Sequence, residues 1–217
     1  MELRDPFSSA THLLAAVWAA YATLVLVRLA PRHPGRRASA VVYGLSMVLL
    51  YAASGLYHAV PADADAVRHL QTLDRSAIFV LIAGTNTPVI AALLRGRQRR
   101  WCLGVMWGVA AVGVAALWLL PRAPYWATVS LYVAMGWLGG LPVVAYYRAV
   151  GWRAMNWVLL GGVLYTGGAA CDLFGWPELS PPPVRVGPHE VFHVFVVAAS
   201  AAFFVFVARH AIGHERR

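Results

Sequence analysis

The chain has 217 residues, of which 60% are hydrophobic and only 12% are charged, a composition too apolar for a water-soluble domain of this length. The 18 basic residues, all of them arginine, outnumber the 9 acidic ones and give a formal net charge of +9. They stand between apolar runs and do not form the clustered, aromatic-interleaved face that nucleic-acid binding requires, so nucleic acid is excluded as a partner.

Seven stretches approach the length of about 20 apolar residues that a membrane helix needs. In chain order they are residues 10–27, 40–60, 73–94, 101–120, 125–147, 155–173 and 189–208. The connections between them are short and rich in Pro, Gly and Arg. We therefore predict an all-α membrane protein, a seven-transmembrane helix bundle in which residues 1–217 form a single integral membrane domain.

Small residues recur at four-residue spacing in two of these stretches, at Gly104 and Gly108 and at Gly136 and Gly140. This spacing lets helix backbones approach one another closely in a membrane, and it predicts helix packing at both pairs. The segments TNTP, residues 85–88, and GGVLYTGG, residues 161–168, are also interpreted as packing features, with a kink at the proline.

Arginine is distributed unequally between alternate loops. The first, third and fifth loops and the C-terminus hold Arg28, Arg32, Arg36, Arg37, Arg95, Arg97, Arg99, Arg100, Arg148, Arg153, Arg209, Arg216 and Arg217. The N-terminus and the other loops hold only Arg4, Arg68, Arg75, Arg122 and Arg185. Because basic residues accumulate on the cytoplasmic side, the pattern predicts a plasma-membrane protein with its N-terminus outside and its C-terminus in the cytoplasm.

Three polar residues lie in the hairpin that the second and third predicted spans form. Ser54 and His58 are four residues apart near the end of the second span and so share one helix face. Asp74 begins the third span, and the hairpin places it at the same membrane face. The chain then crosses the bilayer four times before the seventh span, which returns it to that face with His189 and His193, again four residues apart.

Three imidazoles are a usual ligand set for catalytic zinc, with a fourth position left for water. We therefore expect His58, His189 and His193 to bind Zn²⁺. Asp74 fits a catalytic role in orienting water or accepting its proton, and Ser54 fits a role as hydrogen-bond donor to a developing oxyanion.

Other interpretations of these residues remain open. Asp74 also suits a helix cap or a pair with Arg75. The string HEVFH matches the zinc-protease pattern, in which Glu190 would be the general base, although a protease would leave His58 and Asp74 unexplained.

The roles of three more residues are not decided by the sequence. Glu190 lies about 100° from His189 around the helix, either beside the site or toward the interface. Asp172 ends the sixth span and is interpreted as interfacial. His12 can reach the same face, but we do not count it among the ligands.

The segments SGLYH, LDRSAIFVLIAGTNTP, LLGGVLYTGG and HEVFHVFVVAAS resemble, in that order, the bacterial hemolysin III family. That family is similar to the progestin and adipoQ (adiponectin) receptors and, more distantly, to alkaline ceramidases. The resemblance extends from near residue 9 to about Ser200. It implies a seven-helix fold with zinc held by the histidines named above and completed by the motif Asp and Ser. The chain departs from the family at Arg75, where His or Tyr is common, and from the adiponectin receptors in its predicted orientation, which is the inverse of theirs.

The leading hypothesis is a zinc-dependent hydrolase that cleaves an amide or ester bond of a membrane lipid, such as a ceramide-like substrate. One alternative is a receptor or sensor with a structural zinc, and another is a cytolytic pore-forming protein. A pore needs polar residues through the bilayer, and the fourth, fifth and seventh spans carry almost no charge at mid-depth, which argues against it. The expected partners are the lipid bilayer and a lipid substrate, and the sequence does not indicate an oligomeric state.

Overall fold

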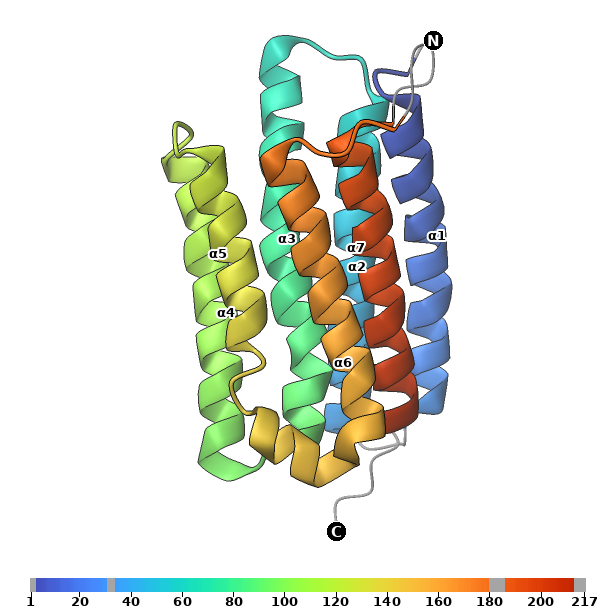
Figure 1. Cartoon of the computed structure of the whole chain (residues 1–217), viewed down its shortest axis with the longest axis vertical. Helices are drawn as coiled ribbons and strands as arrows, with labels where there is room; N and C mark the ends of the chain where they lie inside the picture. The colour runs from blue at the N-terminus through green and yellow to red at the C-terminus, as the bar shows by residue number, and fades with distance from the viewer. Residues whose placement is uncertain (1–2, 31–33, 180–185, 213–217) are drawn as a thin grey trace.

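A computed structural model describes residues 3–30, 34–179 and 186–212, so Arg32, Arg185, Arg216 and Arg217 of the loop charges lie outside the described residues. The described residues form seven α-helices and no strand, which confirms the all-α prediction. The helices are α1 (Pro6–Leu29), α2 (Pro34–Ala59), α3 (Ala64–Leu93), α4 (Gly96–Leu119), α5 (Tyr125–Leu138), α6 (Val143–Phe174) and α7 (Pro188–Phe206), followed by a π-helical turn at Val207–Ala211. They run side by side, with the two chain ends at opposite ends of the bundle (Figure 1).

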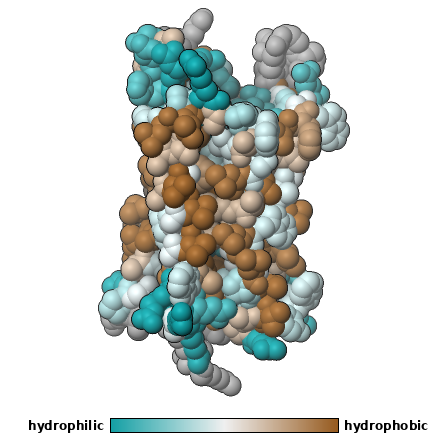
Figure 2. All heavy atoms as spheres, turned by 90° about the vertical axis from the view of Figure 1, so that its left-hand side faces the viewer, coloured by the Kyte–Doolittle hydropathy of each residue, from teal (hydrophilic) through white to brown (hydrophobic). Residues whose placement is uncertain are grey.

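Six of the seven helices, all except α5, are long and apolar enough to cross a membrane. Large apolar side chains face outward along them, for example Leu14 on α1 and Val112 on α4, each about 70% exposed. Figure 2 shows the hydrophobic surface as a band at mid-height, with hydrophilic residues at both ends. Because a bilayer is the solvent that matches such a band, the chain is an integral membrane protein.

The fifth predicted span, residues 125–147, does not form one helix. α5 ends at Leu138 and is 14 residues long, or about 21 Å at 1.5 Å per residue, which is less than the hydrocarbon core. Gly139 and Gly140 have low helix propensity, and Pro142 cannot donate to the helix, so the chain turns here before α6 begins at Val143. α6 thus starts twelve residues before the predicted 155–173 span, and it bends at Gly151, whose φ of 74° is open to glycine.

α3 also begins earlier than predicted. Its N-cap is Asp63, whose carboxylate accepts hydrogen bonds from the backbone N–H groups of Asp65 and Ala66. Asp74 therefore lies in the third turn of the helix. The alternative that Asp74 caps its own helix is wrong, and its buried side chain needs another explanation.

The close helix contacts occur at glycines other than the predicted ones. A Cβ atom added to Gly84 on α3 would lie 2.1 Å from Ser46 Oγ on α2, whereas one added to Gly104, Gly108 or Gly136 would meet nothing within 4 Å. A Cβ added to Gly140 would meet only the nearby backbone oxygen of Trp137. The predicted packing at these two glycine pairs is wrong, since no neighbouring helix covers these positions, and Gly136 and Gly140 line an internal cavity instead.

Candidate metal centre

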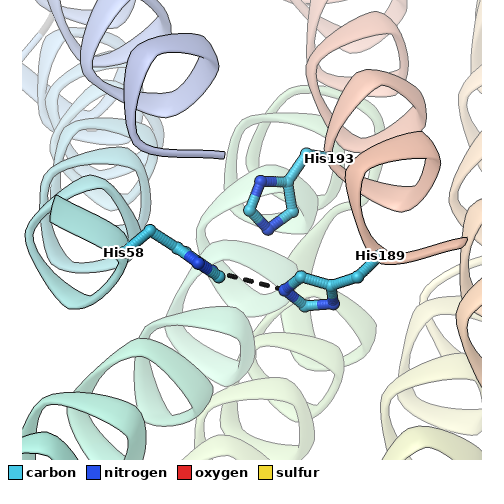
Figure 3. A group of neighbouring side chains, drawn as sticks. All are labelled: His58, His189 and His193. Carbon is cyan, nitrogen blue, oxygen red and sulfur yellow. Dashed lines mark hydrogen bonds between the residues drawn. The ribbon is translucent and has the colours of Figure 1, made fainter. Parts of the chain in front are cut away.

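His58, His189 and His193 meet at the end of the bundle that holds the N-terminus (Figure 3). His58 is the penultimate residue of α2, and His189 and His193 occupy the first two turns of α7. Each offers one ring nitrogen, and the three nitrogens lie within 4.8 Å of one another. The convergence follows from the topology, because α2 ends and α7 begins at the same end of the bundle.

The spacing between two of these nitrogens suits a metal ion. His58 Nε2 and His189 Nε2 are 3.3 Å apart. Two nitrogens bound to a tetrahedral zinc at about 2.0–2.1 Å are separated by about 3.3 Å. In Figure 3 one ring nitrogen of His193 points into the gap between the other two rings, as a third ligand would.

A carboxylate holds the other ring nitrogen of two of the histidines. His58 Nδ1 lies 3.1 Å from Asp5 Oδ2, and His189 Nδ1 lies 3.0 Å from Asp172 Oδ1. When each Nδ1–H donates to its carboxylate, both Nε2 atoms carry lone pairs, and these lone pairs face each other. A cation between them would relieve this repulsion, so the donor set fits a divalent metal.

His193 lacks such a carboxylate. Its Nδ1 atom is buried and has no hydrogen-bond partner among the described residues. Its ring instead stacks on the ring of His12 from α1, with centroids 3.7 Å apart and planes inclined by 14°. His12 thus reaches the same end of the bundle, as the sequence allowed, and contacts a candidate ligand.

The residues before α1 bind to the end of α2. The guanidinium of Arg4 donates to the carbonyl of Tyr57 and lies over its ring, and the Asp5 N–H donates to the carbonyl of His58 at 3.0 Å. Partial burial on its own would raise the pKa of Asp5, but hydrogen bonds from His58 and from Ser8 outweigh it and hold that pKa well below its ordinary value. Asp5 therefore stays ionised beside the histidines.

Asp74 and Ser54 lie beside each other next to the histidines. Both are buried, and the Ser54 hydroxyl is placed to donate a hydrogen bond to the Asp74 carboxylate. Both residues line the cavity that opens from the histidines. The two residues expected to act in catalysis and the three expected to bind metal are thus brought together.

Glu190 turns away from this site and caps its own helix. Its Oε2 accepts a hydrogen bond of 2.7 Å from the backbone N–H of Gly187, and its Oε1 lies 3.4 Å from Ser8 Oγ. A zinc protease needs this carboxylate free beside the metal. The HEVFH string therefore supplies two histidines here without the protease base.

A cavity of about 800 Å³ extends from the histidines into the bundle. Asp74 and Val89 both line it, and they are 15 residues apart on α3, which corresponds to about 22 Å. Its walls come from six helices, all but α4, and are mainly aliphatic and aromatic beyond the histidine end. The site thus joins a polar end to a long apolar chamber.

Comparison with known proteins identifies the family of this chain. The model of the family described as "Haemolysin-III related" matches residues 2–204. The chain belongs to this family. It is 35% identical over 199 residues to "Hemolysin-3" of Bacillus cereus, covering 89% of this chain and 85% of that protein. It is 31% identical over 166 residues to a "Hemolysin-3 homolog" of Bacillus subtilis (strain 168), covering 76% and 74%.

In this haemolysin-III related chain, sequence reasoning missed the two carboxylates that bond to the histidines. Asp5 has no role predicted from the sequence, and Asp172 is predicted at the interface, whereas it accepts hydrogen bonds from both His189 and the Tyr125 hydroxyl. One signal was available, because both acids end or precede spans at the membrane face of the histidines. Metal-binding histidines usually donate their second N–H to a carboxylate, and this rule would have selected them.

Proposed function

We propose that this haemolysin-III related protein is a zinc-dependent hydrolase that cleaves an amide or ester bond of a membrane lipid, such as a ceramide-like lipid. The observation that carries the proposal is the position of the three histidines at one end of a cavity of about 800 Å³. A substrate for such a site has one polar, cleavable group and a long apolar chain.

The length of the cavity supports a lipid chain. The distance of about 22 Å from Asp74 to Val89 is close to the length of an extended 18-carbon chain, about 21 Å for 17 bonds that each advance about 1.25 Å. A lipid that places its carbonyl at the histidines would therefore lay its tail along the cavity.

His58, His189 and His193 would hold the zinc. When bound, zinc would polarise the carbonyl and activate water as the nucleophile. Asp74 would accept the proton that the attacking water gives up and return it to the leaving nitrogen or oxygen, so that an amide and water become a carboxylic acid and an amine. Ser54, beside Asp74, would donate a hydrogen bond to the developing oxyanion or hold Asp74 in position.

The bundle end that carries the histidines would face outward in this proposal. Arg95, Arg97 and Arg153 lie at the opposite end, and the arginine bias predicts that this end faces the bacterial cytoplasm. A reporter that is active only in the cytoplasm, fused after Arg217, would be active in this orientation and inactive in the inverse one.

Metal content and hydrolysis should be measured together on detergent-purified protein. We expect about one zinc per chain, lost in His58→Ala, His189→Ala and His193→Ala. His69→Ala is the matched control, because His69 is exposed on α3 and bonds to the carbonyl of Asp65. Asp74→Asn should keep the zinc but lose about 100-fold or more of the hydrolysis of 18-carbon lipid amides and esters.

Three outcomes would separate the candidate functions. Zinc retained with no hydrolysis of any lipid amide or ester, even by the unmodified chain, would favour a structural zinc in a receptor or sensor. Leakage of dye from vesicles that is unaffected by His58→Ala would favour a pore. Folded protein that binds no metal would overturn the site.

A further inference from the structure

Thr85 stands out among the threonines of the helices. Five others donate their hydroxyl to the carbonyl four residues earlier, which is the usual way to satisfy a helical threonine in an apolar setting: Thr11, Thr23, Thr72, Thr87 and Thr166. The Thr85 hydroxyl is buried and has no partner among the described residues. Buried hydroxyls are almost always paired, so an unpaired one suggests an absent ligand.

Thr85 lines the cavity at mid-depth. It follows Asp74 by 11 residues on α3, so it lies about 16 Å further into the bundle. The surrounding wall is mainly apolar and includes Leu81, Ile82 and Val89. Asn86 also lines it, but its amide N–H donates to the carbonyl of Ile82, so Thr85 places an unpaired hydroxyl in a region that otherwise suits a hydrocarbon chain.

Tyr165 on α6 supplies a second hydroxyl beside Thr85, and the two hydroxyls lie near each other without meeting the geometry of a hydrogen bond. Its oxygen lies 2.8 Å from Ser200 Oγ on α7, and Ser200 Oγ also accepts a hydrogen bond of 2.6 Å from the Tyr51 hydroxyl. This network fixes the position of the Tyr165 hydroxyl. After the bond to Ser200, a phenolic hydroxyl still has capacity for another partner.

We infer that Thr85 and Tyr165 form a second polar site in the cavity, which binds a hydroxyl group carried on the lipid chain. A hydroxyl both donates and accepts, so it can accept from Thr85 while it donates to Tyr165, or the reverse. The inference rests on the proposed function in one respect, since the carbonyl is taken to lie beside Asp74. At about 1.25 Å per bond, a distance of about 16 Å is about 13 bonds, which places the hydroxyl near carbon 14 of the chain.

The test is a comparison of two free fatty acids, which are products of the proposed reaction and need no hydrolysis to bind. Displacement of a fluorescent fatty acid from the purified full-length protein would be measured with 14-hydroxyoctadecanoic acid and with octadecanoic acid. We expect the hydroxylated chain to bind about three- to tenfold more tightly. 7-Hydroxyoctadecanoic acid, whose hydroxyl would lie about 8 Å from the carboxylate, should gain nothing.

Matched variants assign the preference to the threonine. Thr85→Val removes the hydroxyl at nearly constant shape and should abolish the preference, while Thr85→Ser should retain it. Thr87→Val is the control on the same helix, because Thr87 bonds to Ala83 and Trp107 and does not line the cavity. Equal binding of the two acids by the unmodified chain, or a preference that survives Thr85→Val, would overturn the inference.

The two proposals fail separately. His58→Ala should lose zinc and hydrolysis but keep the preference for the 14-hydroxy chain. A preference that depends on Thr85 in a protein without hydrolytic activity would support this inference and contradict the proposed function. Hydrolysis of plain and hydroxylated chains at the same rate, with no difference in binding, would support the proposed function and contradict this inference.

Discussion

The inner helices of the bundle, α2, α3 and α7, and its outer helices, α4, α5 and α6, are packed very differently. In an 18-residue stretch of α2 and of α3, 61% and 67% of the residues are buried, whereas in α4 and α6 the share is 17%. The glycines follow this division only in part. Gly44, Gly55 and Gly84 on the inner helices leave no room for a Cβ atom, and neither do Gly113 on α4 and Gly161 on α6, where these helices touch Phe79 and Phe203. Gly104, Gly108 and Gly136 on the outer helices meet nothing within 4 Å. The outer helices thus expose most of their surface and pack closely along one face only.

This difference matches the two parts of the site. The three histidines and Asp74 all come from α2, α3 and α7, where close packing fixes side chains in position. α5 and α6 supply much of the cavity wall, and α5 stops at Leu138 beside the cavity. A metal centre needs fixed ligands, whereas a chamber for lipid chains needs mainly an apolar wall.

The largest expected effect is that of metal removal on the inner helices. At a zinc concentration about 1,000 times the dissociation constant, binding stabilises the folded state by about 4 kcal/mol, and a chelator would remove that contribution. Thermal unfolding in detergent with and without chelator measures the loss, and His58→Ala should show none. Hydrogen exchange should increase at the ends of α2 and α7 that carry the histidines and not along α4. An increase in hydrogen exchange spread evenly over all the helices would contradict the division between inner and outer helices.

The substitution Gly84→Ala tests the inner packing next. Its Cβ would lie 2.1 Å from Ser46 Oγ and 2.5 Å from Ser46 Cβ, so α2 and α3 would have to move apart. We expect a loss of about 1–3 kcal/mol in unfolding free energy, measured by denaturant titration in detergent. The double variant Ser46→Gly/Gly84→Ala should recover part of this loss, because it removes the clashing atoms. Two losses that simply add would show that the contact is not the cause.

The sequence predicted the parts of this molecule that depend on strong local patterns. Apolar runs predict helices, and a four-residue spacing places His189 and His193 on one face. Even the convergence with His58 followed from counting membrane crossings. The glycine contacts did not follow, because a spacing of four marks a face without saying what lies opposite. Gly84 and Gly104 differ only in whether another helix covers them.

The contacts of Asp5 and Asp172 with the histidines were not predicted for a similar reason. Each is a single acid near a helix end, where such residues are common as caps or interfacial groups. Their contact with His58 and His189 depends on the side-chain directions of residues far apart in the chain. The break of the helix at Gly139 was easier to predict from the sequence, since two glycines and a proline mark it.

The substitution Asp172→Asn tests whether an outer helix contributes to the metal centre. Asp172 on α6 accepts from His189 Nδ1 at 3.0 Å, and loss of its charge would make the imidazole a weaker ligand. We expect zinc affinity to fall about 10- to 100-fold, measured by competition with a fluorescent chelator. Tyr125→Phe separates the histidine contact from the tyrosine contact, because it removes only the second hydrogen bond of Asp172. Unchanged affinity in Asp172→Asn would confine the centre to the inner helices and the segment before α1.

The smallest effect is expected for Gly104→Ala on α4, the counterpart of Gly84→Ala on α3. Nothing lies within 4 Å of the position of the new Cβ, and alanine has the higher helix propensity, so the substitution should stabilise the protein by up to about 1 kcal/mol. The same denaturant titration measures it. A loss of stability here, as large as that of Gly84→Ala, would mean that another surface covers this face of α4 in the purified protein. A second copy of the chain would be the first candidate, and cross-linking through Gly108→Cys would test for it.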